Sequence, residues 1–112
     1  MPALNITTNV KLDGVDVEPI FSEAAAAVAS IIGRPQHLVM VVLKGSVPIS
    51  FTGTKEPAAF AQLISMGGID KVVKKKLIKS LGIILETHLS IPPTRFFCHV
   101  VDTTAGRQQS KL

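Results

Sequence analysis

The chain has 112 residues, 46% of them hydrophobic, with five Phe and no Trp or Tyr, which predicts one globular domain with a modest core. The longest apolar run, Val39–Leu43, is too short to span a bilayer and no signal peptide is visible, so no membrane association is expected. The formal charge is +4, but five of the twelve basic residues lie within Lys71–Lys79, which indicates one basic helix face. No aromatic residues are interleaved with these lysines, so nucleic-acid binding is not expected either.

The first half of the chain reads as strand, helix, strand. Residues Ala3–Thr8 predict a buried strand, and a polar loop follows to Asp16. Apolar residues then recur at helical spacing as far as Ile32, and Gly33 is a natural C-cap. The apolar, β-branched run Leu38–Leu43 predicts a strand buried on both faces, as in a parallel β-α-β unit.

The second half repeats this order. A short extended piece is expected at Val47–Phe51, whereas Ala58–Met66 fits either a helix or a strand. Apolar residues at helical spacing over Ile69–His88 predict a long helix with its lysines on the opposite face. Residues Arg95–Val101 predict the last strand, with a polar tail after it, and two β-α-β units of similar size result.

Pro2 is a candidate for chemistry. If Met1 is removed, Pro2 becomes a free secondary amine at the head of a buried strand. An α-amino group titrates at about 7.7–8.0 in water, and burial or a nearby cation lowers that value toward the range that a general base needs at neutral pH. With Met1 retained, Pro2 is an amide and cannot act as a base.

Other candidates for chemistry are weaker. Strand alternation puts Cys98 and His99 on opposite faces, so they cannot form a nucleophile–base pair, and Cys98 is expected to be a small buried hydrophobe. As the only cysteine, it also excludes an intrachain disulfide. The histidines share no metal-ligand spacing, so no zinc site is expected. Ser65 lies outside any nucleophile-elbow pattern.

Several short motifs occur in a recognisable order: Met1–Pro2, Thr8–Val10, Gly33–Pro35, Glu56–Pro57, Ser65–Gly67 and Arg95–Asp102. Together they resemble the macrophage migration inhibitory factor and D-dopachrome tautomerase family, and the segments Leu43–Pro48 and Ser65–Gly68 are most similar to plant members. The resemblance implies an α/β (α+β) fold, with tandem β-α-β repeats forming a mixed four-stranded sheet and two helices. It further implies a homotrimer with three sheets inside and six helices outside. Residues 1–102 would form this domain and residues 103–112 a tail.

The resemblance also implies a site at each subunit interface. Pro2 would be the catalytic base and Arg34 the cation that holds the substrate carboxylate, with substrate-binding contacts from Ser65, Met66, Phe97 and His99. The last two would come from the neighbouring subunit. Phe97 has no hydroxyl where relatives use tyrosine, and a lost donor of this kind costs on the order of a hundredfold in rate. The family's thiol motif is absent, because alanines occupy its cysteine positions.

The implied function is a keto-enol tautomerase that acts on phenylpyruvate- or dopachrome-like acids, with weak turnover expected, and with no cofactor and no metal. The alternative is a cytokine-like trimer that has kept the fold and docks a receptor protein. The final residues Ser110, Lys111 and Leu112 match the peroxisomal address, so a peroxisomal import receptor is an expected partner, with a cytosolic pool also compatible.

Overall fold

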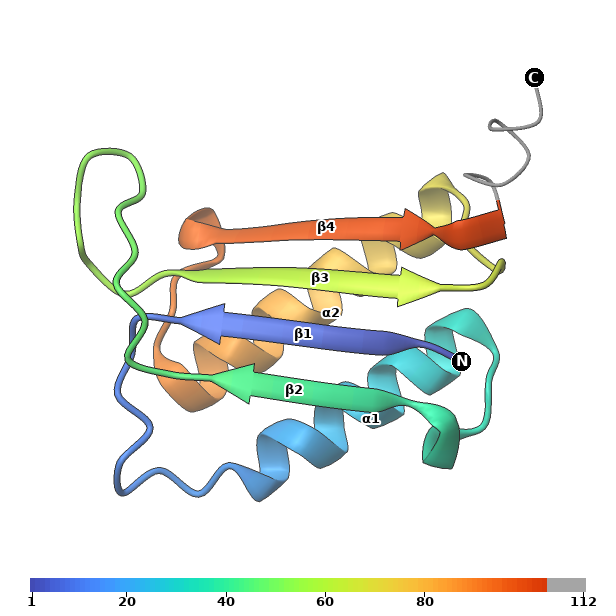
Figure 1. Cartoon of the computed structure of the whole chain (residues 1–112), viewed down its shortest axis with the longest axis horizontal. Coiled ribbons are helices and arrows are strands. Elements are labelled where there is room, and N and C mark those ends of the chain that lie inside the picture. Colours follow the sequence, from blue (N-terminus) through green and yellow to red (C-terminus); the bar gives the residue numbers. More distant parts are fainter. Residues whose placement is uncertain (105–112) are drawn as a thin grey trace.

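The computed structural model describes residues 1–104, which form one four-stranded sheet and two helices (Figure 1). The strands have the order β2-β1-β3-β4; β1 pairs with β2 and β3 with β4 in parallel, while β1 and β3 are antiparallel. Each half of the chain is therefore a β-α-β unit, and the sheet is mixed. The elements are β1 (Ala3–Thr8), α1 (Glu18–Ile32), η1 (Gln36–Leu38), β2 (Met40–Lys44), β3 (Ala59–Ser65), α2 (Lys71–Leu89), η2 (Pro93–Arg95) and β4 (Phe96–Asp102).

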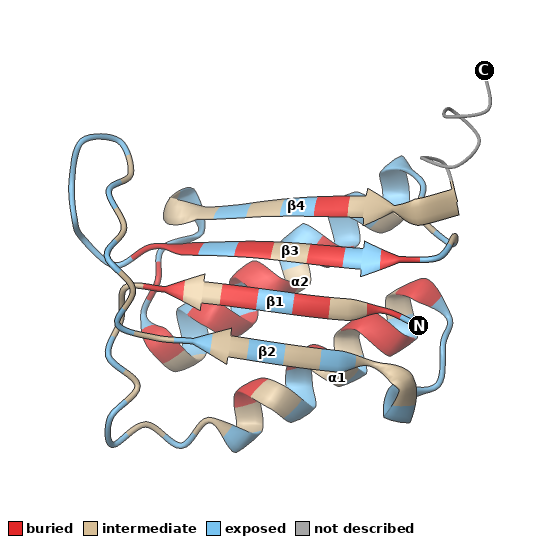
Figure 2. Ribbon diagram, viewed as in Figure 1, coloured by how far each residue is buried: buried red, intermediate tan, exposed pale blue. Residues whose placement is uncertain are grey.

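Both helices cover the same face of the sheet, and the core lies between them and the strands (Figures 1 and 2). The strands alternate between the two faces, so in β3 the buried residues Ala61 and Leu63 are flanked by the exposed residues Phe60 and Ile64. Leu4, Ile6, Ile20, Val28, Leu63, Leu77, Leu81 and Leu85 form the centre of the core. No described helix has the length and apolar character needed to cross a membrane.

The helix ends are set locally. The side chain of Asp70 caps α2 by accepting a hydrogen bond from Val73 N at 2.8 Å. At the end of α1, Gly33 adopts φ 81°, and its N–H donates to Ala29 O at 2.9 Å. This left-handed turn ends the helix, and the chain continues from Arg34 into η1 and β2.

The prediction that Leu38–Leu43 is buried on both faces is wrong. Leu38 belongs to the short helix η1, and β2 begins at Met40. This strand lies at the edge of the sheet and the helices cover only one face, so Met40 is 59% exposed and Val42 is also exposed. The apolar character of this run is therefore not explained by burial within a single chain.

Three other segments also differ from the expectation or settle it. Residues 47–51 are not a strand; Phe51 makes only an isolated bridge with Thr54. The ambiguous segment Ala58–Met66 contains strand β3 and no helix, because its apolar residues alternate across the sheet. The last strand is shifted by one residue relative to the prediction and ends at Asp102.

The face of the sheet opposite the helices is uncovered in the single chain and carries several exposed apolar side chains. By register, Met40, Val42, Phe60, Ile64 and Phe97 all lie on it, and each is exposed. The rings of Phe60 and Phe97 stack at a centroid distance of 5.8 Å and an interplanar angle of 11°. We refer to this side of the sheet as the helix-free face.

Candidate active site

Pro2 lies immediately before β1, where the strand is flanked by β2 and β3. Its carbonyl oxygen accepts a hydrogen bond from Met40 N at 3.0 Å, and its ring is almost fully buried, whereas Met1 is 69% exposed. The parity of β1 puts Pro2 on the helix side with Leu4 and Ile6. While Met1 is attached, the nitrogen of Pro2 belongs to a tertiary amide and has no basic lone pair.

Arg34 reaches the same end of the sheet from the end of α1. Its Nη2 donates a hydrogen bond to Met66 O at 3.1 Å. The residue is exposed, and no other side-chain hydrogen bond or ion pair joins Arg34 to a described residue. A guanidinium has five N–H donors, so Arg34 retains donors that a carboxylate can use.

The turn Ser65–Gly68 follows β3 and faces the start of β1. Ser65 is buried and its Oγ donates to Gly67 O at 3.1 Å, so this hydroxyl stabilises the turn. Gly67 and Gly68 both have φ 78°, which side-chain-bearing residues rarely adopt. A Cβ added at Gly68 would also come within 3.2 Å of Ile32 Cγ2, so the turn packs closely against the end of α1. Pro2, Arg34, Ser65 and Met66 are thus gathered at one end of the sheet.

Phe97 and His99 lie elsewhere in the chain. Both are exposed on the helix-free side of β4, where they pair in register with Phe60 and Gln62. Phe97 lies five residues along the strand from Asp102, which pairs with Ser65; at about 3.3 Å per residue this is about 16 Å. A small aromatic acid held beside Pro2 cannot reach Phe97 of the same chain. Phe97 can therefore join the other four only from a second copy, and His99 lies on the face of the sheet opposite to the side of Pro2.

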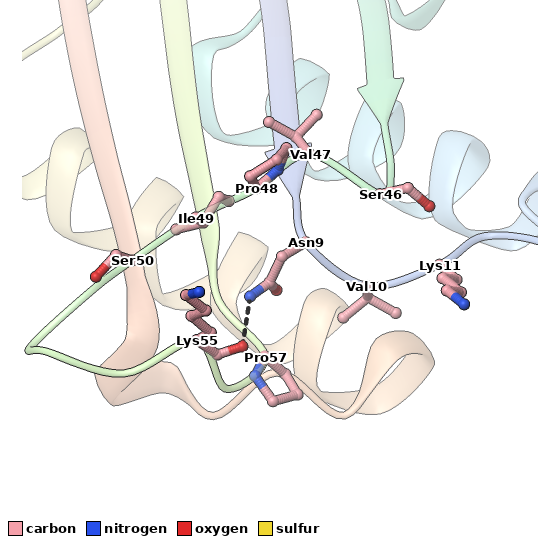
Figure 3. A pocket seen from close by; sticks show the side chains of 10 residues that line it. All are labelled: Asn9, Val10, Lys11, Ser46, Val47, Pro48, Ile49, Ser50, Lys55 and Pro57. Carbon is pink, nitrogen blue, oxygen red and sulfur yellow. Dashed lines mark hydrogen bonds between the residues drawn. The ribbon is translucent and has the colours of Figure 1, made fainter.

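The described cavities lie at the other end of the sheet. A cavity of about 540 Å³ is lined by loop residues after β1 and β2 and before β3, where Asn9 Nδ2 donates to Lys55 O at 3.1 Å (Figure 3). A smaller cavity of about 240 Å³ is lined by Phe60 and Phe97 among other residues. None of the four residues gathered near Pro2 lines either cavity, so these cavities do not form the predicted site.

Among the described residues, the remaining titratable side chains do not form a second centre. Cys98 faces the helix side of β4, and burial raises the pKa of its thiol to about 11, which makes it a poor nucleophile at neutral pH. His88, expected to lie on the apolar stripe of α2, is half-buried, and its Nε2 lies 2.8 Å from Glu23 Oε2 of α1. Within residues 1–104, no cluster of three His, Cys, Asp or Glu side chains could hold a metal ion.

Arg95 is a structural residue that sequence reasoning missed. Its guanidinium donates to Pro57 O, Phe51 O and Glu56 O, each at 3.0 Å, and its Cζ lies 5.5 Å from the Phe51 ring centroid. Nη1 also donates to Thr52 Oγ1 at 3.0 Å, but the other acceptors are backbone carbonyls, which are compatible with almost any residue type and do not signal the contact in advance. Arg95 holds the loop before β3 and has fewer donors left for a ligand than Arg34.

Comparison with known proteins decides the family. The family model for macrophage migration inhibitory factor (MIF) matches residues 1–109. The chain belongs to this family. A MIF homolog from Trichuris trichiura is 31% identical over 102 residues, covering 91% of this chain and 89% of the relative. The MIF structure from Trichinella spiralis matches with a TM-score of 0.81 at 32% identity, covering 89% of this chain and 88% of that one.

A further MIF homologue structure, from Prochlorococcus marinus, has a TM-score of 0.82 at 26% identity, with 89% of this chain and 87% of that chain covered. The predicted MIF-like α+β fold, with a mixed four-stranded sheet and two helices, is confirmed. The trimer stays a prediction. The predicted targeting residues Ser110, Lys111 and Leu112 lie outside the described residues.

Proposed function

We propose that this MIF-family protein is a keto-enol tautomerase that acts on phenylpyruvate- or dopachrome-like acids, with Pro2 as the base after removal of Met1. One observation carries the proposal: Pro2 and the exposed cation Arg34 share one end of the sheet, where Arg34 is held by Met66 O at 3.1 Å. The pairing supplies a proton acceptor and a carboxylate-binding group. Proton transfer between carbon and oxygen needs neither a metal nor a cofactor.

In this reaction the substrate carboxylate binds the free donors of Arg34, and the Pro2 nitrogen removes a proton from the carbon next to the keto group. A proton is then delivered to the keto oxygen to give the enol. In the reverse direction the enol hydroxyl loses its proton and Pro2 delivers a proton to the carbon. The ring of Pro2 is buried. Burial and the nearby cation both disfavour the protonated amine, so the base should titrate below an ordinary α-amino group.

The proposed active form is a homotrimer. The helix-free face exposes Met40, Phe60 and Phe97 among other apolar side chains, and a second copy of the chain would bury them. The same association would bring Phe97 and His99 to the Pro2 of a neighbouring subunit, to complete the substrate site. Sedimentation should give about three times the chain mass. A monomer at micromolar concentration would remove these two residues from the site.

The test of catalysis compares processed protein with two controls. Protein without Met1 should interconvert the keto and enol forms of an aromatic α-keto acid, whereas the Pro2→Gly variant and protein that retains Met1 should be strongly impaired. The rate should rise with pH through the lowered pKa of the Pro2 amine. Equal rates for processed protein and Pro2→Gly would exclude Pro2 as the base.

A second candidate function is a cytokine-like trimer that binds a receptor protein with little catalysis. Retention of Met1 would favour it, because an acylated Pro2 nitrogen cannot take a proton. The mass of the intact protein isolated from its native source separates the two functions. Retained Met1 supports the binding function, and removed Met1 supports the tautomerase.

We further propose that Ser110–Leu112, at the end of the predicted tail of residues 103–112, directs the protein to peroxisomes through an import receptor. Deletion of these three residues should leave a folded protein in the cytosol; continued import would contradict the proposal. The similarity to plant members also stays a prediction, because the relatives named above are not plant proteins.

A further inference from the structure

Asp102, the last residue of β4, contacts the turn beside Pro2 through its side chain. Its Oδ1 accepts hydrogen bonds from Gly67 N at 3.0 Å, Thr104 N at 2.9 Å and Thr104 Oγ1 at 2.6 Å. It also pairs in register with Ser65. We propose that Asp102 is a positioning residue that fixes the carboxylate-binding site through this turn. The inference rests on the proposed tautomerase function.

The turn needs such a contact because of its sequence. Gly67 and Gly68 are adjacent and both lie at φ 78°, and glycine has more conformational freedom than any other residue. Without external contacts, two consecutive glycines would let the turn sample many conformations. Three side chains limit it here: Ser65 Oγ binds Gly67 O, Arg34 binds Met66 O, and Asp102 binds Gly67 N.

Asp102 and Arg34 hold neighbouring residues of this turn from different elements. Asp102 comes from β4 and binds the amide of Gly67, while Arg34 comes from the end of α1 and binds the carbonyl of Met66. The carbonyl of Met66 and the amide of Gly67 belong to the same peptide group, which is planar and rigid. Any displacement of Gly67 N therefore moves Met66 O, and with it the hydrogen bond that orients Arg34. In this way the Asp102 carboxylate sets the position of the guanidinium.

A purely structural role predicts a different result. Asp102 also caps the helical turn at Thr103–Thr104, and loss of a cap lowers stability without acting on the site. Asp16 offers a matched control, because its Oδ1 accepts the N–H of Glu18 at 3.2 Å near the start of α1, away from this turn. The variants Asp102→Ala and Asp16→Ala each remove one carboxylate that accepts backbone N–H groups, from Gly67 and Thr104 in the first case and from Glu18 in the second.

The experiment measures kcat and KM of the processed protein with an aromatic α-keto acid and with its methyl ester. Asp102→Ala should raise KM for the acid about tenfold, which corresponds to the loss of one charge-assisted contact, and change kcat and the ester kinetics little. Asp102→Asn keeps an acceptor oxygen and should raise KM about threefold; it serves if the alanine variant does not fold. Asp16→Ala should leave KM unchanged. In an Arg34→Ala background, Asp102→Ala should add nothing, because the two act through one contact.

An equal KM for the Asp102 and Asp16 variants, or a full tenfold effect without Arg34, would overturn the inference and leave the tautomerase function intact. If the wild-type protein turns over no acid, the proposed function fails separately. The dissociation constant of the acid, measured by calorimetry, then takes the place of KM with the same tenfold expectation. Unchanged affinity in Asp102→Ala, or no binding by the wild type, would overturn the inference.

Discussion

Replacing Asn9 with aspartate should destabilise the fold although the two side chains have the same shape. Asn9 ties the end of β1 to the segment before β3: its Nδ2 donates to Lys55 O at 3.1 Å and Glu56 O at 2.9 Å, and its Oδ1 accepts from Ala58 N at 2.8 Å. Aspartate keeps the acceptor for Ala58 but replaces the double donor with a charged oxygen. Two attractive contacts with carbonyls thereby become repulsive.

The magnitude follows from these contacts. Two neutral hydrogen bonds at about 1 kcal/mol each give a loss of about 2 kcal/mol, and repulsion between the carboxylate and the carbonyls increases it, with screening by solvent limiting the total to roughly 3 kcal/mol. In a domain of this size such a loss lowers Tm by roughly 10 °C. The repulsion also raises the pKa of the introduced carboxyl in the folded state. The repulsive part of the destabilisation should therefore be small below the unfolded-state pKa of about 3.9 and grow as pH rises toward the raised folded-state pKa, whereas the loss of a donor persists at every pH.

Urea unfolding at fixed protein concentration, at about pH 7 and about pH 4, measures both effects. The control Gln36→Glu adds the same charge at an exposed residue of η1 and should change the free energy of unfolding by less than about 0.5 kcal/mol. A loss of the same small size in Asn9→Asp would refute the argument, as would a difference from wild type that is larger at about pH 4 than at about pH 7.

Four further predictions follow from the described contacts. Leu81→Ala, in the core, should cost about 3 kcal/mol in urea unfolding, while Ile83→Ala, on the exposed side of the same helix, should cost under about 1 kcal/mol; equal losses would contradict the core position. Arg95→Lys should speed amide exchange in the loop before β3, because lysine cannot donate to several carbonyls in a fork, and unchanged exchange would argue against this role. Cys98 should react slowly with iodoacetamide at neutral pH and quickly after denaturation, since burial raises its pKa to about 11; fast labelling of folded protein would disprove this. Phe97→Tyr should increase tautomerase turnover if a missing donor limits the rate, and an unchanged kcat would exclude that explanation.

Local sequence patterns predicted most of the elements because each depends on neighbouring residues. The alternation in Ala3–Thr8 and the helical spacing in α2 report directly which side chains face the core. Gly33 ended α1 as expected because its φ of 81° suits glycine. The same parity argument correctly separated Cys98 from His99 on β4.

What the sequence did not predict depends on contacts distant along the chain. The hydrogen bond from Arg95 to Phe51 spans 44 residues, and the one from Gly67 to Asp102 spans 35. Their backbone partners are compatible with almost any residue type, so no local motif marks them. The error in β2 has another origin: its apolar residues were taken as evidence of burial within one chain, whereas β2 is an edge strand and no described part of the chain covers its second face.

The choice between catalysis and binding reduces to the bond between Met1 and Pro2. The position of Pro2 is set by its carbonyl, which binds Met40 N at 3.0 Å, and by its buried ring, and neither contact involves the nitrogen. Removal of Met1 therefore frees the amine without releasing the residue from β1. Because Pro2 is bonded to the first residue of a central strand, the sheet holds its nitrogen in a fixed position. A fixed position favours proton transfer, which requires a short distance between the base and the substrate carbon. The same strand keeps Pro2 in place when Met1 remains, but the amide nitrogen then cannot accept a proton. In that case only the proposed binding of a receptor protein is left as a function.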